Sequence, residues 1–423
     1  MPKINTSFMV AALVKLFSAT SGFFLTLLVT RFLPSDSAGV FLLCLAIVTV
    51  ISYMFRMGFD NIVLRVVSSD VRDIKSQTIV KYALSKVIVF TVLGTITLLV
   101  FKDFLATTVF NKIELANILL IFLFSIPFIS ISFLISQISQ GLNKLFLTGF
   151  FQNLGISIFF LLASSIAYLA LKAEINVDLL SMIYLSSAFL VFLFAAYFFY
   201  KSFHIPTTNA AYTLDKKAIS RDSTKLWISS TMALLMQWSG VLVSGIFLSS
   251  TQVAYLSTAQ RLSMLIGFTL MVVDMVNAQR YSKLWNNNDI QGMRDLSFKS
   301  TIFLLFLVTP AIFTICIYSD FIIQLFGPEY SEASLLLVIM AIGQYVNVLT
   351  GSVGYILNMS GHYKDFMNLY ILGGLSTVIL SIILVNLYSA LGAAIATSLG
   401  LIIFNLSAVY IVKRRLGFWT FLP

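Results

Sequence analysis

Long apolar segments, nearly free of charge, recur along the whole 423-residue chain. The hydrocarbon core of a bilayer is about 30 Å thick, and a helix needs about 20 residues to cross it. Because lipid offers the backbone no hydrogen-bonding partner, such segments cross as helices. Hydrophobic residues make up 59% of the chain and charged residues 10%, whereas about 25% of the residues of a soluble domain are charged. The sequence therefore predicts an all-α integral membrane protein.

The number of sufficiently long apolar segments predicts about twelve transmembrane helices. The first segment is too long for a signal peptide and no convincing small-residue cleavage site follows it, so we expect it to remain as a helix. The expected spans cover residues 8–33, 36–55, 80–101, 116–138, 145–171, 179–200, 225–248, 252–278, 298–318, 332–358, 367–388 and 390–412.

The basic residues predict the orientation of these spans. Of the 27 Lys and Arg residues, 21 fall on the side of the membrane that holds both termini. Two more, Lys15 and Arg261, lie within spans, and the remaining 4 are on the opposite side. Since loops rich in Lys and Arg stay in the cytoplasm, both termini are predicted to be cytoplasmic.

Other ligand classes find little support in the sequence. The net charge of +10 is explained by topology and by attraction to anionic lipid, so we expect no nucleic-acid partner. Cys44 and Cys316 lie within apolar spans, and His204 and His362 stand alone in expected loops. No metal site or disulfide is predicted, because ligands at suitable spacing are missing.

Weak internal similarity divides the chain into two halves. Phe32, Leu33 and Ser35 recur 215 residues later, and Gly141 and Lys144 recur 220 residues later. Six spans per half is an even number, so the two halves keep the same orientation. We expect two six-helix lobes, residues 1–202 and 225–423, related by a pseudo-two-fold axis along the membrane normal, with a cytoplasmic linker at 203–224 and a cavity between the lobes.

Several segments at helix ends have a recognisable sequence: 28–34 (LVTRFLP), 38–41 (AGVF), 58–65, 321–330 (FIIQLFGPEY) and 332–333. Together they resemble the Wzx-type polysaccharide flippases, a group that shares its superfamily with lipid II flippases and multidrug antiporters. The resemblance covers essentially the whole chain. Because its motifs mostly describe helix ends, it indicates the fold better than the cargo.

The resemblance implies a flippase of a bacterial inner membrane, not an enzyme. It would move undecaprenyl-diphosphate-linked oligosaccharide from the cytoplasmic to the periplasmic leaflet for O-antigen or a related surface polysaccharide. A polysaccharide polymerase and a chain-length regulator would be its partners. An anionic diphosphate and a polyhydroxylated glycan cannot cross hydrocarbon unaided, so a hydrated cationic cavity with alternating access is expected. No cofactor is expected apart from H⁺ or Na⁺ coupling.

Charges within or beside spans are the first candidates for the site, because they are costly in lipid. Arg261 and Lys15 could contact the diphosphate, although Arg261 could equally form a structural pair and Lys15 could extend to the interface. Arg56 and Arg65 flank the cytoplasmic end of span two, where they could form a cationic mouth, but topology explains them about as well. Asp274 is the candidate for ion coupling, with pairing to Arg280 or a place at the interface as the alternative.

Neutral polar residues within spans are the second class of candidates. Gln237, Asn153, Gln344 and Asn347 could bind sugar hydroxyl groups along a path, or could join helices to one another.

Two other functions compete with that of a flippase. An ion-coupled multidrug antiporter has the same architecture but commonly needs a buried carboxylate in its first half, where every acid is expected in a loop or at an interface. A non-transporting scaffold of a polysaccharide assembly complex stays open as a further alternative.

Overall fold

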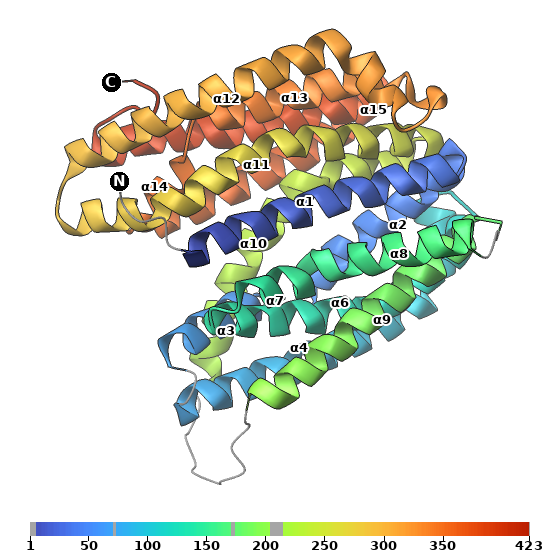
Figure 1. Ribbon diagram of the computed structural model, residues 1–423, viewed down its shortest axis with the longest axis horizontal. Coiled ribbons are helices and arrows are strands. Elements are labelled where there is room, and N and C mark those ends of the chain that lie inside the picture. The colour runs from blue at the N-terminus through green and yellow to red at the C-terminus, as the bar shows by residue number, and fades with distance from the viewer. Residues whose placement is uncertain (1–5, 71–72, 171–173, 204–214, 423) are drawn as a thin grey trace. The chain divides into compact units, whose positions relative to one another are not determined.

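The computed structural model describes residues 6–70, 73–170, 174–203 and 215–422, and the side chains of residues 6–13, 15 and 19 lie outside this description. All regular secondary structure in the described part is helical (Figure 1). Ten of its helices are long and apolar enough to cross a membrane. The predicted all-α, multi-span membrane fold is confirmed, while the number twelve and the symmetry axis stay predictions.

The chain divides into two compact units, Met1–Thr231 and Met232–Pro423. Part of the predicted linker, residues 204–214, lies outside the described residues, and helix α10 begins at Lys216 and continues across the boundary between the units. The helices before α10 are α1 (Thr6–Phe32), α2 (Ser35–Met54), α3 (Phe59–Ser69), α4 (Ile74–Val100), α5 (Lys102–Phe104), η1 (Leu105–Val109), α6 (Leu115–Gly141), α7 (Leu145–Gly149), η2 (Phe150–Leu154), α8 (Gly155–Leu169) and α9 (Val177–Ser202).

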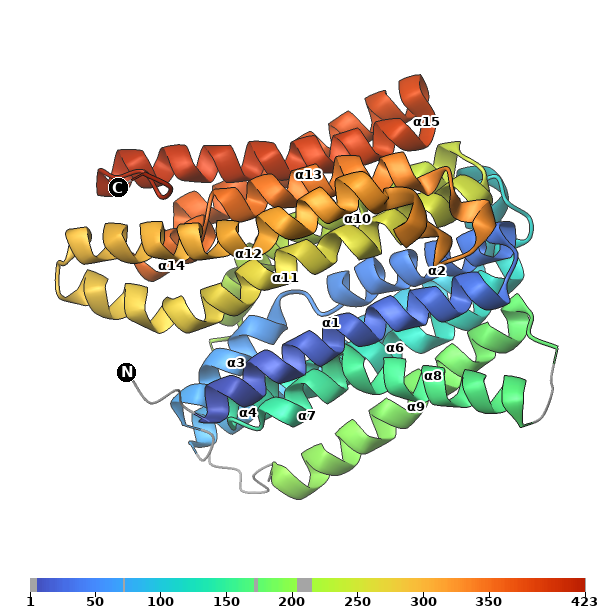
Figure 2. The ribbon, with the colours of Figure 1, turned by 45° about the horizontal axis from the view of Figure 1, so that its top comes forward.

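The second half of the chain has fewer but longer helices, seen from two directions in Figures 1 and 2. They are α10 (Lys216–Phe247), α11 (Ser250–Asn286), α12 (Ile290–Gln324), η3 (Pro328–Tyr330), α13 (Ala333–Leu349), α14 (Val353–Met359) and α15 (Tyr363–Leu416).

Local sequence explains where several helices begin. The Asn176 side chain accepts a hydrogen bond of 2.8 Å from the backbone N–H of Leu179 at the start of α9, and Ser249 accepts one of 3.3 Å from Gln252 at the start of α11. Such caps satisfy backbone donors that the first helical turn leaves without partners.

In the N-terminal unit, α6 is the central helix and packs against α2, α3, α4 and α9. Aromatic rings fill the contact, since the Phe122 ring lies 5.0 Å from that of Phe41 and 4.9 Å from that of Tyr184. All three side chains are buried. The first pair of rings meets edge to face and the second pair is stacked. Both arrangements add to the van der Waals contacts between packed helices.

In the C-terminal unit, α13 packs against α11, α12 and α15, and helical geometry is interrupted within α12 at Tyr318, between α13 and α14, and within α15. Gly351 has a φ of 72° and separates α13 from α14. Helix α15 has 54 residues, about 80 Å at 1.5 Å per residue, and Tyr388 and Ser389 break its helical conformation. A single membrane crossing takes only about 20 residues, so α15 is long enough for two. The break falls between the two spans predicted at 367–388 and 390–412.

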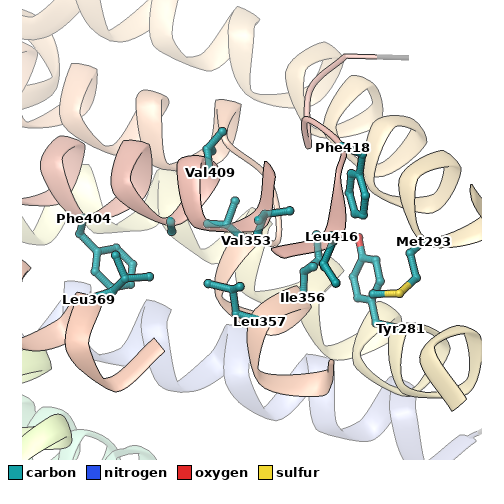
Figure 3. Close-up of a cluster of buried hydrophobic side chains, with 12 residues drawn as sticks. Tyr281, Met293, Val353, Ile356, Leu357, Leu369, Phe404, Val409, Leu416 and Phe418 are labelled. Carbon is teal, nitrogen blue, oxygen red and sulfur yellow. The ribbon is translucent and has the colours of Figure 1, made fainter. Parts of the chain in front are cut away.

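The core at one end of this unit gathers side chains from α11, α12, α14, α15 and the residues after α15 (Figure 3). The residues after α15 are fixed there, because the Phe418 side chain is 5% exposed and Thr420 is fully buried. This chain end is therefore part of the folded unit.

Candidate functional site

A pocket of about 270 Å³ lies within the C-terminal unit, between α10, α11, α13 and α15. No Asp, Glu, Lys or Arg lines it. Its walls combine amide and hydroxyl groups with methionine and other apolar side chains. The polar residues that line it are Gln237, Gln260, Ser263, Gln344, Asn347, Tyr370, Thr397 and Ser398.

Hydrogen bonds between helices fix part of this lining. The Gln260 side chain is buried and donates from Nε2 to the backbone carbonyl of Gln237, which joins α11 to α10. Ser398 donates from its hydroxyl to the carbonyl of Ile339 over 3.0 Å, which joins α15 to α13. These bonds hold the walls of the pocket in place.

Close helix approach brings α13 and α15 together at the pocket. A Cβ atom at Gly343 would lie 2.8 Å from the Cβ of Ser398, so only glycine permits this approach. A Cβ at Gly267 would likewise lie 2.8 Å from Oε1 of Gln344. The two glycines thus make room for Gln344 and Ser398 at the pocket.

The chemistry of the pocket is that of neutral hydrogen bonding. Amide groups and hydroxyl groups both donate and accept, so they match the hydroxyl groups of a sugar. The volume is just below the range of about 300–1,000 Å³ that small-molecule sites have, enough for one sugar ring rather than a whole oligosaccharide.

The structure brings three of the residues singled out from the sequence, Gln237, Gln344 and Asn347, to this pocket. Arg261 follows Gln260 on α11 but does not line the pocket. Its guanidinium carbon lies 5.0 Å from the ring centre of Trp238 on α10, a cation–π distance. This contact holds a half-buried positive charge beside the pocket wall.

Arg56 is enclosed within the N-terminal unit, just after α2. Its side chain is 4% exposed, and its Nε lies 3.4 Å from Oδ2 of Asp60. The guanidinium carbon is 3.6 Å from the ring centre of Phe133 and 4.3 Å from that of Tyr53. Burial lowers the pKa of Arg56 and raises that of Asp60, and the opposite charge of each partner counteracts the shift.

The other predicted site residues lie neither at the pocket nor beside Arg56. Arg65 is exposed on α3, and Asn153 is exposed in the π-helical segment η2. The side chain of Lys15 lies outside the described residues. Asp274 is buried on α11, and the described structure gives it no ion pair, while Arg280 is exposed.

Five further residues that line the pocket were not predicted from the sequence: Gln260, Ser263, Tyr370, Thr397 and Ser398. The criterion that selected Gln237, an amide within an apolar span, applies equally to Gln260 and would have found it. Serine and threonine are common in membrane helices because they bond to their own backbone, so only tertiary contacts distinguish those that line a pocket.

Comparison with known proteins now gives the family. Residues 5–277 match the family model described as polysaccharide biosynthesis protein. This match covers more than half of the chain.

The chain belongs to this family.

The family assignment predicted from the sequence is therefore confirmed. A probable low-salt glycan biosynthesis flippase, Agl15 of Haloferax volcanii, is 30% identical over 176 residues, which are 41% of this chain and 37% of that relative. The matched region thus spans a little over a third of the relative's length.

Solved structures show the same fold. The lipid II flippase MurJ in an inward-closed conformation gives a TM-score of 0.74 at 17% identity, with 96% of this chain and 87% of MurJ covered. An inward-facing multidrug resistance MATE transporter of the MOP superfamily gives 0.76 at 15% identity, with coverage of 96% and 98%. These proteins are named as a flippase and a transporter rather than as enzymes, which agrees with the prediction of a non-enzymatic membrane protein.

Proposed function

We propose that this protein is a flippase that moves an undecaprenyl-diphosphate-linked oligosaccharide from the cytoplasmic to the periplasmic leaflet, for O-antigen or a related surface polysaccharide. It would lie in a bacterial inner membrane with both termini in the cytoplasm, next to a polysaccharide polymerase and a chain-length regulator. Alternating access of the two lobes would move the substrate.

The pocket in the C-terminal unit carries this proposal. A glycan is uncharged in most of its bulk and rich in hydroxyl groups, which amide and hydroxyl side chains bind by hydrogen bonds. Asn347 and Gln344 lie one turn apart, with 3.4 Å between Asn347 Nδ2 and Gln344 Oε1. They leave further donors and acceptors for a ligand. Tyr370 adds a ring that can pack against the face of a sugar.

Arg261 has the charge that a diphosphate requires. It is half-buried beside the pocket wall and lies over Trp238, where a positive charge is less hydrated than at an open surface. We propose that it attracts the diphosphate while the pocket holds a sugar ring. A charge-assisted contact of this kind is stronger than one between neutral groups.

A multidrug antiporter of the same fold is the competing function. A site for organic cations needs negative charge, and no acidic residue lines this pocket. The neutral lining therefore favours the glycan.

Reconstitution into proteoliposomes tests the proposal. A fluorescent undecaprenyl-diphosphate-linked glycan is placed in both leaflets, and the fraction that an external glycan-degrading enzyme can reach is followed over time. We expect the protein to make nearly all of the lipid accessible, and Gln260→Ala and Asn347→Ala to slow this at least several-fold. Asn386→Ala, an exposed amide on α15, is the matched control. Accessibility that stays at half with folded, reconstituted protein would refute the proposal.

A further inference from the structure

A short segment after α15, residues 417–422, runs along the C-terminal unit, and we call it the strap. Helix α15 is capped by Gly417, whose φ of 84° lets the chain leave the helical path. The Lys413 side chain fixes this turn, because its Nζ donates a hydrogen bond of 2.8 Å to the carbonyl of Gly417. The strap therefore leaves the helix in a defined direction.

Side chains of the strap alternate between the protein interior and the surface. Phe418 and Thr420 are buried, whereas Trp419 and Phe421 are exposed. Figure 3 shows Phe418 next to the hydroxyl end of Tyr281 in the core at this end of the unit. Thr420 brings a polar side chain into the interior, where such groups almost always have hydrogen-bonding partners.

The hydrogen bonds of Thr420 join α13 to α12. Its hydroxyl donates a hydrogen bond of 2.7 Å to the carbonyl of Thr350, the residue that follows α13. Its own carbonyl accepts hydrogen bonds of 3.0 Å from Ser297 and 3.5 Å from Thr301, both on α12. All four residues are at most 3% exposed, so water does not compete for these bonds.

The end of α13 needs a partner from outside the helix. The last carbonyls of a helix have no donor within it, and Gly351, with a φ of 72°, separates α13 from α14. A Cβ at Gly351 would also lie 2.5 Å from Oγ1 of Thr301, so α12 approaches the backbone closely at this break. Thr420 supplies a donor to the carbonyl of Thr350 where the helix ends.

Thr350 connects the strap with the pocket. Its hydroxyl is a donor 2.8 Å from the carbonyl of Asn347, which lines the pocket, and 3.2 Å from Oδ1 of Asn405 on α15. Asn405 is buried and donates in turn to the carbonyl of Leu401, another pocket residue, over 2.9 Å. A continuous series of hydrogen bonds thus leads from Thr420 to the backbone of two residues of the pocket.

We propose that Thr420 is a positioning residue for the pocket, because it holds the last turn of α13 and thereby sets the place of Asn347. An amide donates to a hydroxyl oxygen only over about 2.7–3.2 Å, so a small shift of this turn changes how well the Asn347 amide meets a sugar. The effect on substrate binding rests on the proposed flippase function, whereas the hold on α13 does not.

Hydrogen exchange of the purified full-length protein in detergent, without any glycan lipid, tests the hold on α13. Thr420→Val removes the hydroxyl and leaves the carbonyl of Thr350 without this donor, while Thr420→Ser keeps it. We expect the backbone amides of residues 346–350 to exchange at least tenfold faster in Thr420→Val and within twofold of the unaltered rate in Thr420→Ser. Thr314→Val is the matched control, because Thr314 is exposed on α12 and its hydroxyl bonds to Pro310 of the same helix.

The flipping assay, run at several densities of the glycan lipid, tests the consequence for the pocket. Thr420→Val should raise the half-saturating density at least threefold and change the limiting rate less than twofold, because binding geometry is what changes. A variant that is merely less stable would lose limiting rate instead. Thr420→Ser should behave like the unaltered protein. In an Asn347→Ala background, Thr420→Val should add less than twofold, since the group that it positions is already gone.

Three results would overturn the role of Thr420. They are unchanged exchange of residues 346–350 in Thr420→Val, a lower limiting rate at an unchanged half-saturating density, and effects of Thr420→Val and Asn347→Ala that multiply. If Thr420→Val cannot be purified, Ser297→Ala, which removes the donor to the carbonyl of Thr420, is measured in its place with the same expectations. If the unaltered protein moves no lipid, the proposed function fails, and hydrogen exchange alone decides on the strap.

Discussion

Removing the charge of Arg56 should destabilise the N-terminal unit strongly. The guanidinium is surrounded by Asp60, Phe133 and Tyr53 at the distances given above, and its side chain is 4% exposed. Arg56→Met leaves the Asp60 carboxylate buried without its partner, which costs about 3–5 kcal/mol. In a unit of 231 residues, each kcal/mol corresponds to about 2–4 °C, so the melting temperature should fall by roughly 6–20 °C.

A double-mutant cycle separates the pair from the rest of the packing. Asp60→Leu alone should cost about as much as Arg56→Met, whereas the two together should lose much less than the sum, since buried ion pairs can be replaced by apolar residues at little cost. Thermal unfolding in one detergent, followed by size-exclusion chromatography, measures all four proteins. Arg65→Met, an exposed arginine on the neighbouring α3, is the control and should change stability by less than about 0.5 kcal/mol. Additive losses in the double variant would refute the reasoning.

Three further outcomes follow from the packing. Gly58→Ala should lower the melting temperature, because φ at Gly58 is 74° and the new Cβ would lie 2.7 Å from the backbone nitrogen of Trp227. The left-handed backbone conformation alone costs a residue with a side chain about 1–2 kcal/mol. An unchanged melting temperature would contradict this. Phe404→Ala should cost about 3–5 kcal/mol through the cavity that it leaves, whereas the exposed Leu406→Ala should be nearly neutral in the same thermal assay. Arg261→Lys keeps the charge but loses the planar contact with Trp238. In the flipping assay it should therefore retain more activity than Arg261→Ala. Equal loss of activity in both variants would show that the positive charge is not what the transport requires.

Helix positions were largely predictable from the sequence. Ser35 and Ser250, paired by the internal similarity, are each the first residue of a helix, and the break at Ser389 falls where one span was expected to end and the next to begin. Both follow from apolar length, which lipid imposes on every crossing. The amphipathic α3 was not predicted, because it is too short and too polar to meet that criterion.

The site was predictable only in part. Gln237, Gln344 and Asn347 were selected because an amide in an apolar span is unusual, and they do line one pocket. Arg56 was selected by the same reasoning about charge, and the structure encloses it between Asp60 and two aromatic rings. Sequence position shows that a polar group is near the membrane, but not which neighbour it meets.

The sequence by itself determined that the chain crosses a membrane many times as helices and where most crossings begin and end, because the hydrocarbon thickness and the cost of unpaired backbone groups act on each segment separately. Only the tertiary structure decided which polar residues share a pocket, that Arg56 and Asp60 are enclosed together, and that Asp274 is buried near Tyr281 and Ser352. Those facts depend on contacts between segments far apart in the chain, and helix packing, unlike hydropathy, leaves little trace in local sequence.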